Sequence, residues 1–297
     1  LAASLRAVSG VAGVQVTVDQ NVLAIPDFTA GAPEIVPQVD ARTLALTDDG
    51  FGFVTGAGEI EALGTLAGSV EEREATRLVL GPSRTIAGLL GPEGVWLART
   101  SSAPDLLLDA RPGLIAPSVD GYQFVWSVAA DGAGGIVAFE LDGTAREVEA
   151  ALPDDQRIVS LQVSRDDTRV LLLLDGAAGP RLVVAAIVRD DATGVPLRLG
   201  ELRELPISGE RAIDATWVDE VRVASVATTE DGTLVELHEI GGRTRALGLP
   251  PSAVQIVGGN SGVEGIRVLG EGGAIFEPRG SGWQSTGVRA SFLATQQ

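Results

Sequence analysis

The sequence predicts an all-β protein: a β-propeller, most simply of six four-stranded blades, preceded by a short α/β fragment of another domain. Three observations support this prediction. A turn containing Ser, Thr or Asn together with Asp recurs along the chain, apolar and polar residues alternate on both sides of it, and 38 of the 297 residues are glycine. Glycine averages ~7% in globular proteins, so this excess indicates many tight turns.

The clearest copy of the repeat has Ser164 and Asp166 in a turn between alternating segments 158–163 and 169–174. A second copy has Ser118, Asp120 and Gly121, followed by residues 122–128. Weaker copies begin at Thr47, Ser83, Trp217 and Asn260. The mean interval is about 43 residues, close to the length of one propeller blade. Ser and Asp side chains bond backbone amides two residues on, and Gly accepts positive φ, so each turn can close a hairpin.

Three further strands are expected after each turn. In the fourth unit we expect them at 169–174, 181–188 and 197–205, and in the fifth at 221–228, 233–240 and 243–247. Six such units leave no room for helices. A pair of β-sandwiches also gives short strands with frequent turns, but the longer repeat with one recurrent turn type favours the propeller.

The first 30 residues differ from the repeat. Leu1, Leu5 and Val8 have helical spacing, Gly10 ends that segment, and residues 14–18 alternate as in a strand. We therefore interpret 1–30 as the end of an incomplete domain, 31–40 as a linker and 41–297 as the propeller. A chain that starts with Leu is expected to be a piece of a longer product, with any membrane anchor upstream. No apolar run is long enough to span a bilayer.

The charge and the rare residue types exclude several classes of function. The chain has 22 basic residues, all Arg, against 40 acidic ones, which gives a net charge of −18. Such a surface repels phosphate backbones, so no nucleic-acid partner is expected. There is no Cys and only one His, so thiolate nucleophiles, Cys-ligated metals and His-rich metal sites are excluded.

The remaining polar motifs predict no catalytic residue, metal ligand or cofactor. Adjacent carboxylates such as Asp166 and Asp167 are interpreted as solvated turns rather than calcium ligands, because no spaced calcium loop is present. No G-x-S-x-G elbow occurs. His238 lies in an apolar–polar alternation and is expected to be a surface or half-buried strand residue rather than a base.

The aromatic residues are interpreted mainly as packing. Trp96, Trp126 and Trp217 lie inside strand patterns and are expected between blades, and Trp283 is expected to begin the last strand. Tyr122, beside an Asp-Gly pair, is the aromatic residue most expected at the surface. The residues to which we assign a structural role, in turns or in packing, are Ser83, Ser118, Asp120, Gly121, Trp126, Ser164, Asp166 and Trp217.

These residues resemble a known family. Residues 1–18, with a Leu-x3-Leu helix leading into Val14-Gln15-Val16-Thr17-Val18, resemble the end of a GerMN domain. The turn at 117–121 with Trp126, the turn at 163–166 and the Gly282-Trp283 pair resemble the propeller of the actinobacterial LpqB lipoproteins. The resemblance implies lipid anchoring on the outer face of the cell membrane, through an upstream Cys. It also implies an accessory role in MtrA–MtrB two-component signalling, with the extracellular part of the sensor kinase MtrB as partner. It transfers no functional residue.

We therefore expect a non-enzymatic module that binds the external domain of a sensor histidine kinase. The alternative from another class is a calcium-dependent propeller hydrolase. It requires Asp, Glu and Asn side chains converging on the ring axis, although Asn21 and Asn260 are the only asparagines. A module that holds a small ligand or cell-wall fragment at the channel mouth also remains open.

Overall fold

The chain forms two compact units, Leu1–Asp40 and Ala41–Gln297. The computed structural model describes residues 15–18, 21–24, 43–54, 59–101, 103–132, 135–259, 262–280 and 282–296. In the first unit, β1 (Gln15–Val18) pairs antiparallel with β2 (Asn21–Ala24). β1 lies within the strand predicted at 14–18, whereas β2 is not predicted from the sequence. The predicted helix near 1–8 and the linker at 31–40 lie outside the described residues.

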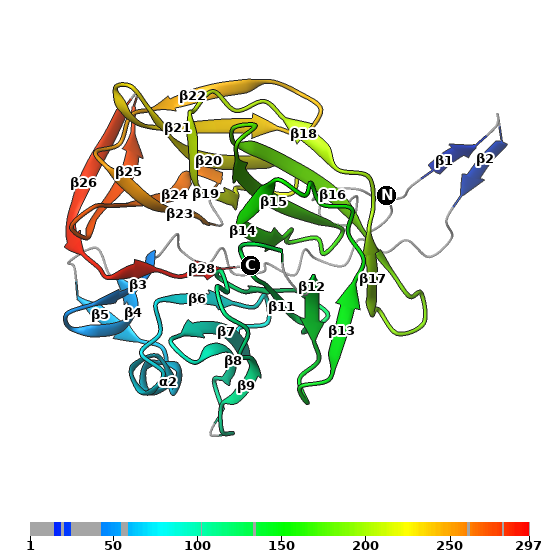
Figure 1. Cartoon of the computed structure of the whole chain (residues 1–297), viewed down its shortest axis with the longest axis horizontal. Coiled ribbons are helices and arrows are strands. Elements are labelled where there is room, and N and C mark those ends of the chain that lie inside the picture. The colour runs from blue at the N-terminus through cyan, green and yellow to red at the C-terminus, as the bar shows by residue number, and fades with distance from the viewer. Residues whose placement is uncertain are drawn as a thin grey trace. The chain divides into compact units, whose positions relative to one another are not determined.

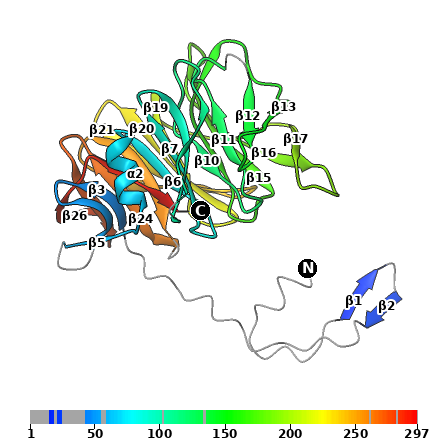
Figure 2. The same ribbon diagram turned by 90° about the horizontal axis from the view of Figure 1, so that it is seen from below.

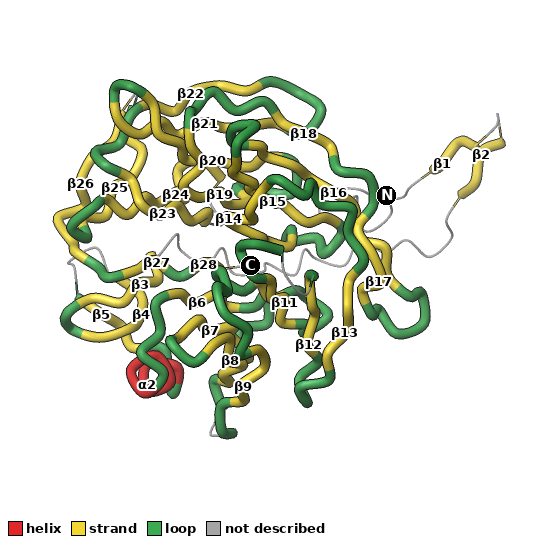
Figure 3. Tube along the Cα trace, viewed as in Figure 1, coloured by secondary structure: helices red, strands yellow, loops and turns green. Residues whose placement is uncertain are grey.

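The second unit is a six-bladed β-propeller, as predicted. Figure 1 shows six small sheets arranged around one axis, and Figure 3 shows that the regular structure of this unit is nearly all strand, joined by loops. The strands of each blade are given from the axis outward. The first blade consists of β27 (Phe292–Leu293), β3 (Thr43–Thr47), β4 (Gly50–Val54) and β5 (Ile60–Ala62), and the second of β6 (Arg77–Leu80), β7 (Ile86–Gly91), β8 (Gly94–Arg99) and β9 (Leu106–Asp109). The third blade consists of β10 (Ser118–Val119), β11 (Val125–Val128), β12 (Ile136–Phe139) and β13 (Ala145–Val148).

The last three blades follow in sequence order. The fourth blade consists of β14 (Gln156–Val163), β15 (Arg169–Gly176) and β16 (Arg181–Arg189) with β17 (Pro196–Leu199) and β18 (Arg203–Leu205). The fifth consists of β19 (Arg211–Trp217), β20 (Arg222–Thr229), β21 (Gly232–Glu239) and β22 (Thr244–Gly248). The sixth consists of β23 (Ala253–Gly259), β24 (Gly262–Gly270), β25 (Ala274–Arg279) and β26 (Gly282–Arg289). The fourth strand predicted at 197–205 is in fact two short strands, β17 and β18, which both pair with β16.

The C-terminal segment closes the ring. β27 pairs antiparallel with β3 and supplies the inner strand of the first blade, while β28 (Thr295–Gln296) runs parallel to β6 of the second. Contacts between inner strands run in the order β6, β10, β14, β19, β23, β27 and back to β6. The C-terminus therefore lies near the middle of the ring (Figure 1). This closure covers the edges that separate sheets would expose.

Each blade is buried on both faces because its neighbours pack against it. Along β15, Leu172 packs in a cluster with Trp126 of the third blade, whereas Leu171 and Leu173 pack in a cluster with Trp217 of the fifth. Residues 170–175 are all buried. A strand covered on both faces is continuously apolar rather than alternating, which accounts for the Val-Leu-Leu-Leu-Leu run.

The recurring turns connect the inner strand of a blade to the next strand. In three blades the turn has one geometry: the N–H of Arg84, Gln123 and Asp167 donates to the carbonyl three residues earlier, of Gly81, Asp120 and Ser164. These same three residues have φ of 57°, 68° and 57°. They are non-glycine residues held in the left-handed region of backbone conformation. The turns of these three blades therefore share a backbone conformation as well as a sequence pattern.

Two further features depart from the sequence analysis. Helix α2 (Leu66–Glu72) contradicts the expectation of no helix; it packs on the outside of the ring against β4 and β8 and buries Leu66 and Val70 (Figures 1 and 2). The Thr47 turn lies between the second and third strands of its blade, because β27 takes the innermost place. The turn predicted at Asn260 and Ser261 lies outside the described residues. No helix among the described residues could cross a membrane.

Candidate functional site: the central channel

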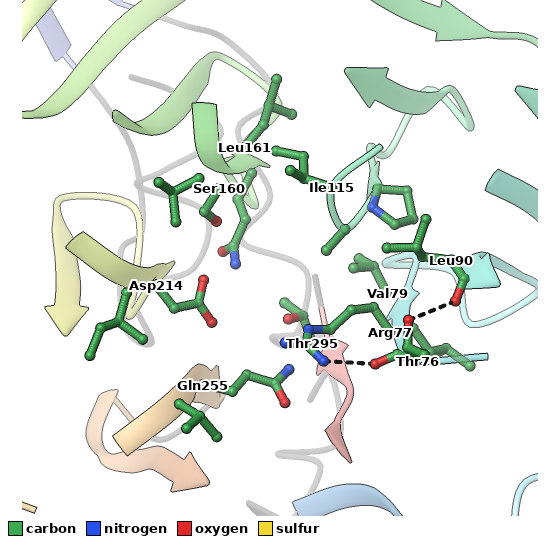
Figure 4. A pocket seen from close by; sticks show the side chains of 17 residues that line it. Thr76, Arg77, Val79, Leu90, Ile115, Ser160, Leu161, Asp214, Gln255 and Thr295 are labelled. Carbon is green, nitrogen blue, oxygen red and sulfur yellow. Dashed lines mark hydrogen bonds between the residues drawn. The ribbon is translucent and has the colours of Figure 1, made fainter. Parts of the chain in front are cut away.

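The inner strands enclose a cavity of about 270 Å³ on the ring axis. Figure 4 shows side chains from several blades directed into it. Its lining includes polar residues from the second, fourth, fifth and sixth blades and from the C-terminal segment, namely Thr76, Arg77, Ser160, Gln162, Asp214, Gln255 and Thr295. Because every blade contributes one inner strand, residues far apart in sequence meet here.

Three of these residues occupy the same position in their blades. The inner turn begins at Gly81 in the second blade, at Ser164 in the fourth and at Val218 in the fifth. Arg77, Ser160 and Asp214 each lie four residues before the start of this turn. Equivalent positions on neighbouring inner strands lie at one level around the axis. Arg77, Ser160 and Asp214 therefore belong to one layer of the channel.

β-Bulges direct Ser160, Asp214 and Gln255 inward. The pairing register shifts around Val159 in β14, Ile213 in β19 and Val254 in β23, each one residue before a polar lining residue. A bulge lets two consecutive side chains face the same side of a strand. Each of the three strands therefore places an apolar residue and then Ser160, Asp214 or Gln255 along the channel.

Asp214 and Arg77 carry opposite charges on opposite sides of the channel. β6 and β19 are separated by two blades in each direction around the ring. In Figure 4 the Asp214 carboxylate and the Arg77 guanidinium point toward one space, and among the described residues neither forms an ion pair. The guanidinium donates one hydrogen bond, to the carbonyl of Thr76 at 2.8 Å.

The ionisation of Asp214 is strongly perturbed. Its carboxylate is enclosed by the channel, and burial raises its pKa to about 6. The N–H groups of Ile256 and Ala215, which donate to it at 3.1 and 2.9 Å, oppose this shift, as does the positive charge of Arg77. The group therefore changes charge near neutral pH.

The glutamines of the lining are engaged in joining blades. The Gln255 amide both donates to the Leu293 carbonyl at 2.6 Å and accepts from the Leu293 N–H at 2.9 Å. Gln162 likewise donates to the Ala215 carbonyl at 3.0 Å and accepts from the Trp217 N–H at 3.3 Å. These amide groups hold neighbouring blades together and are not directed at a ligand. Asp214 and Arg77 are the charged residues in the described lining of the cavity.

One end of the channel opens into a wider depression of about 450 Å³, here called the collar. Ile115, Val159, Ile213 and Val254 line both the cavity and the collar. The Arg157 and Arg211 side chains, 51% and 67% exposed, lie at its rim, on either side of the shielded Asp175 carboxylate.

Asp120, predicted to have a structural role, is the centre of a buried hydrogen-bond cluster. Its carboxylate accepts from the N–H of Phe124 at 2.8 Å, from Trp126 Nε1 at 2.9 Å and from the Arg189 guanidinium at 2.7 Å. The residue is 1% exposed. The Gly121 N–H donates to Asp167 of the next blade at 2.7 Å. The cluster joins the third blade to the fourth.

Ser118 lies in β10 rather than in the turn. It is fully buried, and its hydroxyl accepts from the Val163 N–H of the next blade at 2.9 Å. Thr216 holds the equivalent position in the fifth blade and accepts from Gly258 N–H at 2.9 Å. These hydroxyls form a second layer of bonds between blades.

The other residues with a predicted structural role lie in inner turns or between blades. Ser164 accepts from the Arg169 N–H and donates to Asp166 at 2.5 Å, within its turn. The hydroxyl of Ser83 lies 2.7 Å from that of Thr85 in the exposed turn of the second blade. Trp217 is 3% exposed and donates from Nε1 to the Gln162 carbonyl at 3.1 Å.

The remaining aromatic residues lie as follows. Trp126 is fully buried, Trp96 is 9% exposed and Tyr122 is 54% exposed. The Arg189 guanidinium lies over the Tyr122 ring, 4.5 Å from its centroid. Trp283 lies near the start of β26, which β27 and β28 follow, so the prediction that it begins the last strand is wrong.

The expectation that His238 lies at or near the surface is also wrong. The residue is 0% exposed, with Nε2 2.9 Å from the Ser225 hydroxyl and Nδ1 3.1 Å from that of Thr244. It lies on β21, which is covered on both faces, so alternation along the strand does not place it in solvent. Burial is the largest cause of a lowered pKa, and the negative charge of Glu236 opposes it.

This environment predicts an unusual titration for His238. Because it is the only histidine, its ring signals in a ¹H–¹³C NMR spectrum are unambiguous. We expect its folded-state pKa to lie below 6.5. The unfolded chain then binds the proton more readily, so stability is lost as the pH falls below about 6.5. A ring that titrates at or above 6.5 would contradict the buried, neutral assignment.

Sequence reasoning missed Arg77, Ser160, Asp214 and Gln255. Their signal is positional: each is a polar residue inside an otherwise apolar inner strand, a few residues before the recurring turn. Asp214 is the one carboxylate in the described lining of the cavity. Across the part of the chain that the structure describes, no group of three His, Cys, Asp or Glu side chains could hold a metal ion.

Comparison with known proteins decides the family. The family model of the lipoprotein LpqB β-propeller domain matches residues 55–290. The chain belongs to the LpqB β-propeller family. The channel, the collar and the Asp120 cluster described above therefore belong to an LpqB-type propeller. No curated protein sequence matches the chain.

Solved structures resemble the LpqB-type propeller at low sequence identity. TolB from Acinetobacter baumannii aligns with a TM-score of 0.54 at 14% identity, covering 74% of this chain and 57% of TolB. A puromycin-hydrolyzing peptidase of Mycobacterium tuberculosis aligns with a TM-score of 0.49 at 19% identity, covering 71% and 37%. The chain thus spans little more than half of TolB. At these identities the TolB likeness supports the propeller fold alone.

Proposed function

We propose that this propeller is a non-enzymatic accessory module that binds the extracytoplasmic domain of an MtrB-like sensor histidine kinase. Membership of the LpqB family supports a cell-surface lipoprotein, held at the outer face of the cell membrane by a lipid on an upstream segment. The observation that carries the proposal is the collar, because it combines exposed apolar and cationic side chains on a strongly acidic chain.

The collar has the composition of a protein-binding surface. Val254 is 42% exposed and lies with Ile115, Val159 and Ile213 around the channel mouth. Arginine and apolar side chains surrounding a depression are common binding determinants. Arg157 and Arg211 are the charged residues among the described collar lining, and both lie near Asp175, while the whole chain carries −18. The fitting partner surface presents an apolar projection flanked by carboxylates.

Binding would act on signalling by shifting a conformational equilibrium. A sensor domain with two states responds only if the propeller binds one of them more tightly. A differential affinity of about 1.4 kcal/mol changes the ratio of the two states tenfold. No chemical step in the propeller is needed, since the effect depends on the difference between two binding free energies.

Titration of the purified sensor domain with the propeller tests this proposal. We expect saturable binding, and we expect Val254→Asp and Arg211→Glu each to weaken it at least tenfold. The control is Tyr122→Ala, because Tyr122 follows β10 at the opposite end of the inner strands and should leave affinity within about twofold. Absence of binding, or equal loss with Tyr122→Ala, would contradict the proposed collar interface.

A further inference from the structure

We propose that the central channel is a binding site for a small zwitterion, whose ammonium group lies against Asp214 and whose carboxylate lies against Arg77. The class is that of amino acids and similar molecules with both charges on a short chain. The site lies inside the ring and its test requires no partner, although the collar is its route from solvent.

The arrangement of charge carries this inference. Asp214 and Arg77 belong to one layer of the channel and come from opposite blades, the second and the fifth. Their charged groups point into one space and form no ion pair with each other (Figure 4). A ligand with two opposite charges can contact both groups at once, whereas a lone anion would also face Asp214 and a lone cation would also face Arg77.

Both groups retain hydrogen-bonding capacity toward the cavity. Arg77 has five N–H donors and uses one of them on the Thr76 carbonyl. Asp214 accepts one backbone N–H on each carboxylate oxygen and a hydrogen bond from the Ser160 hydroxyl, and four acceptor sites leave it room for a further hydrogen bond. The amides of Gln162 and Gln255, in contrast, are engaged with neighbouring blades. The recognition capacity of the lining is thus concentrated at the two charges.

The size and access of the cavity fit a small ligand. Its volume of about 270 Å³ is slightly below the ~300–1,000 Å³ of typical drug-sized pockets. The cavity shares Ile115, Val159, Ile213 and Val254 with the collar, which gives a route from solvent. These apolar side chains can also contact the methylene chain between the two charges of the ligand.

A series of ω-amino acids measures this geometry directly. Glycine, β-alanine, 4-aminobutyrate, 5-aminopentanoate and 6-aminohexanoate place the two charges at increasing separation. Isothermal titration calorimetry is expected to show an affinity maximum at one chain length. That member should bind at least tenfold more tightly than the alkanoate and the alkylamine of equal length. No binding by any member, or equal binding by the alkanoate, would overturn the proposal.

Substitutions assign the two charges. Asp214→Asn and Arg77→Gln are each expected to reduce the affinity of the best ω-amino acid at least tenfold. Arg245→Gln and Asp231→Asn, at exposed positions, are the matched controls and should leave it unchanged. Circular dichroism and thermal melting verify that each variant is folded. Unchanged affinity in either channel variant would overturn the assignment.

The pH dependence needs no variant. Arg77 is the only other charged residue in the described cavity lining, and Arg157 and Arg211, which pair with Asp175, line the collar. Because the pKa of Asp214 is about 6, affinity for the ω-amino acid should fall as the pH is lowered from 7 to 5. An alkanoate control should not weaken over that range, since lowering the pH removes a negative charge. Affinity that is constant between pH 7 and 5 would overturn the role of Asp214.

Discussion

Replacing Asp120 by alanine is expected to lower the free energy of unfolding by about 3–5 kcal/mol. The Asp120 carboxylate is paired with the Arg189 guanidinium at 2.7 Å, and their side chains are 0% and 10% exposed. Removing one partner leaves a shielded cation and the buried indole N–H of Trp126 without their acceptor. Breaking such a pair costs far more than the net contribution of the pair to stability, because the remaining group is desolvated.

Urea denaturation followed by tryptophan fluorescence measures this change. Asp142→Ala is the matched control, since Asp142 is an exposed turn residue whose carboxylate accepts hydrogen bonds from Thr144 within its own turn. The control should change the midpoint little. A loss below about 1 kcal/mol for Asp120→Ala would show that the Asp120 cluster does not join the third and fourth blades.

Removing residues 291–297 is expected to abolish cooperative folding of the propeller. The deletion takes away the inner strand of the first blade, with the buried Phe292 and Leu293, and leaves the Gln255 amide without both of its partners. The milder change Phe292→Ala should cost about 3–5 kcal/mol, the range for emptying a buried aromatic site. Phe292 packs 6.1 Å from Phe51, measured between ring centroids.

Thermal melting and limited proteolysis distinguish a closed ring from an open one. Without β27, the strands β3 to β5 should become the first segment cleaved, because an open edge replaces their inner neighbour. Leu249→Ala, at a 52% exposed position, is the control and should melt like the unaltered chain. Cooperative melting of the truncated chain at an unchanged temperature would contradict closure by the C-terminal segment.

The sequence predicts the blade number because a similar turn marker recurs about once per blade. The markers around Ser83, Asp120 and Ser164 repeat along the chain, and the turns share one conformation. The closing strands β27 and β28 carry no such marker, so their pairing with the first two blades could not be read from the repeat. Helix α2 was missed because its apolar residues Leu66 and Val70 form only a single i, i+4 pair.

The channel could not be predicted for a different reason. Alternation assigns side chains to faces only while the register is regular, and bulges at Val159, Ile213 and Val254 break it. The burial of His238 has a related cause, because neighbouring blades cover both faces of a strand that the pattern treats as half-exposed. Whether a polar residue of an inner strand faces the channel thus depends on the closed ring, and the local sequence pattern does not predict it.

The pairing of Phe292 with Leu46 has a consequence for biosynthesis. A ribosome adds roughly 5–20 residues per second, so β3 waits on the order of tens of seconds for its partner strand to be made. During that interval the later blades can assemble one by one, while the inner edge of β3 in the first blade stays unpaired. We therefore expect the nascent protein to depend on chaperones most strongly until Phe292 and Leu293 have been made.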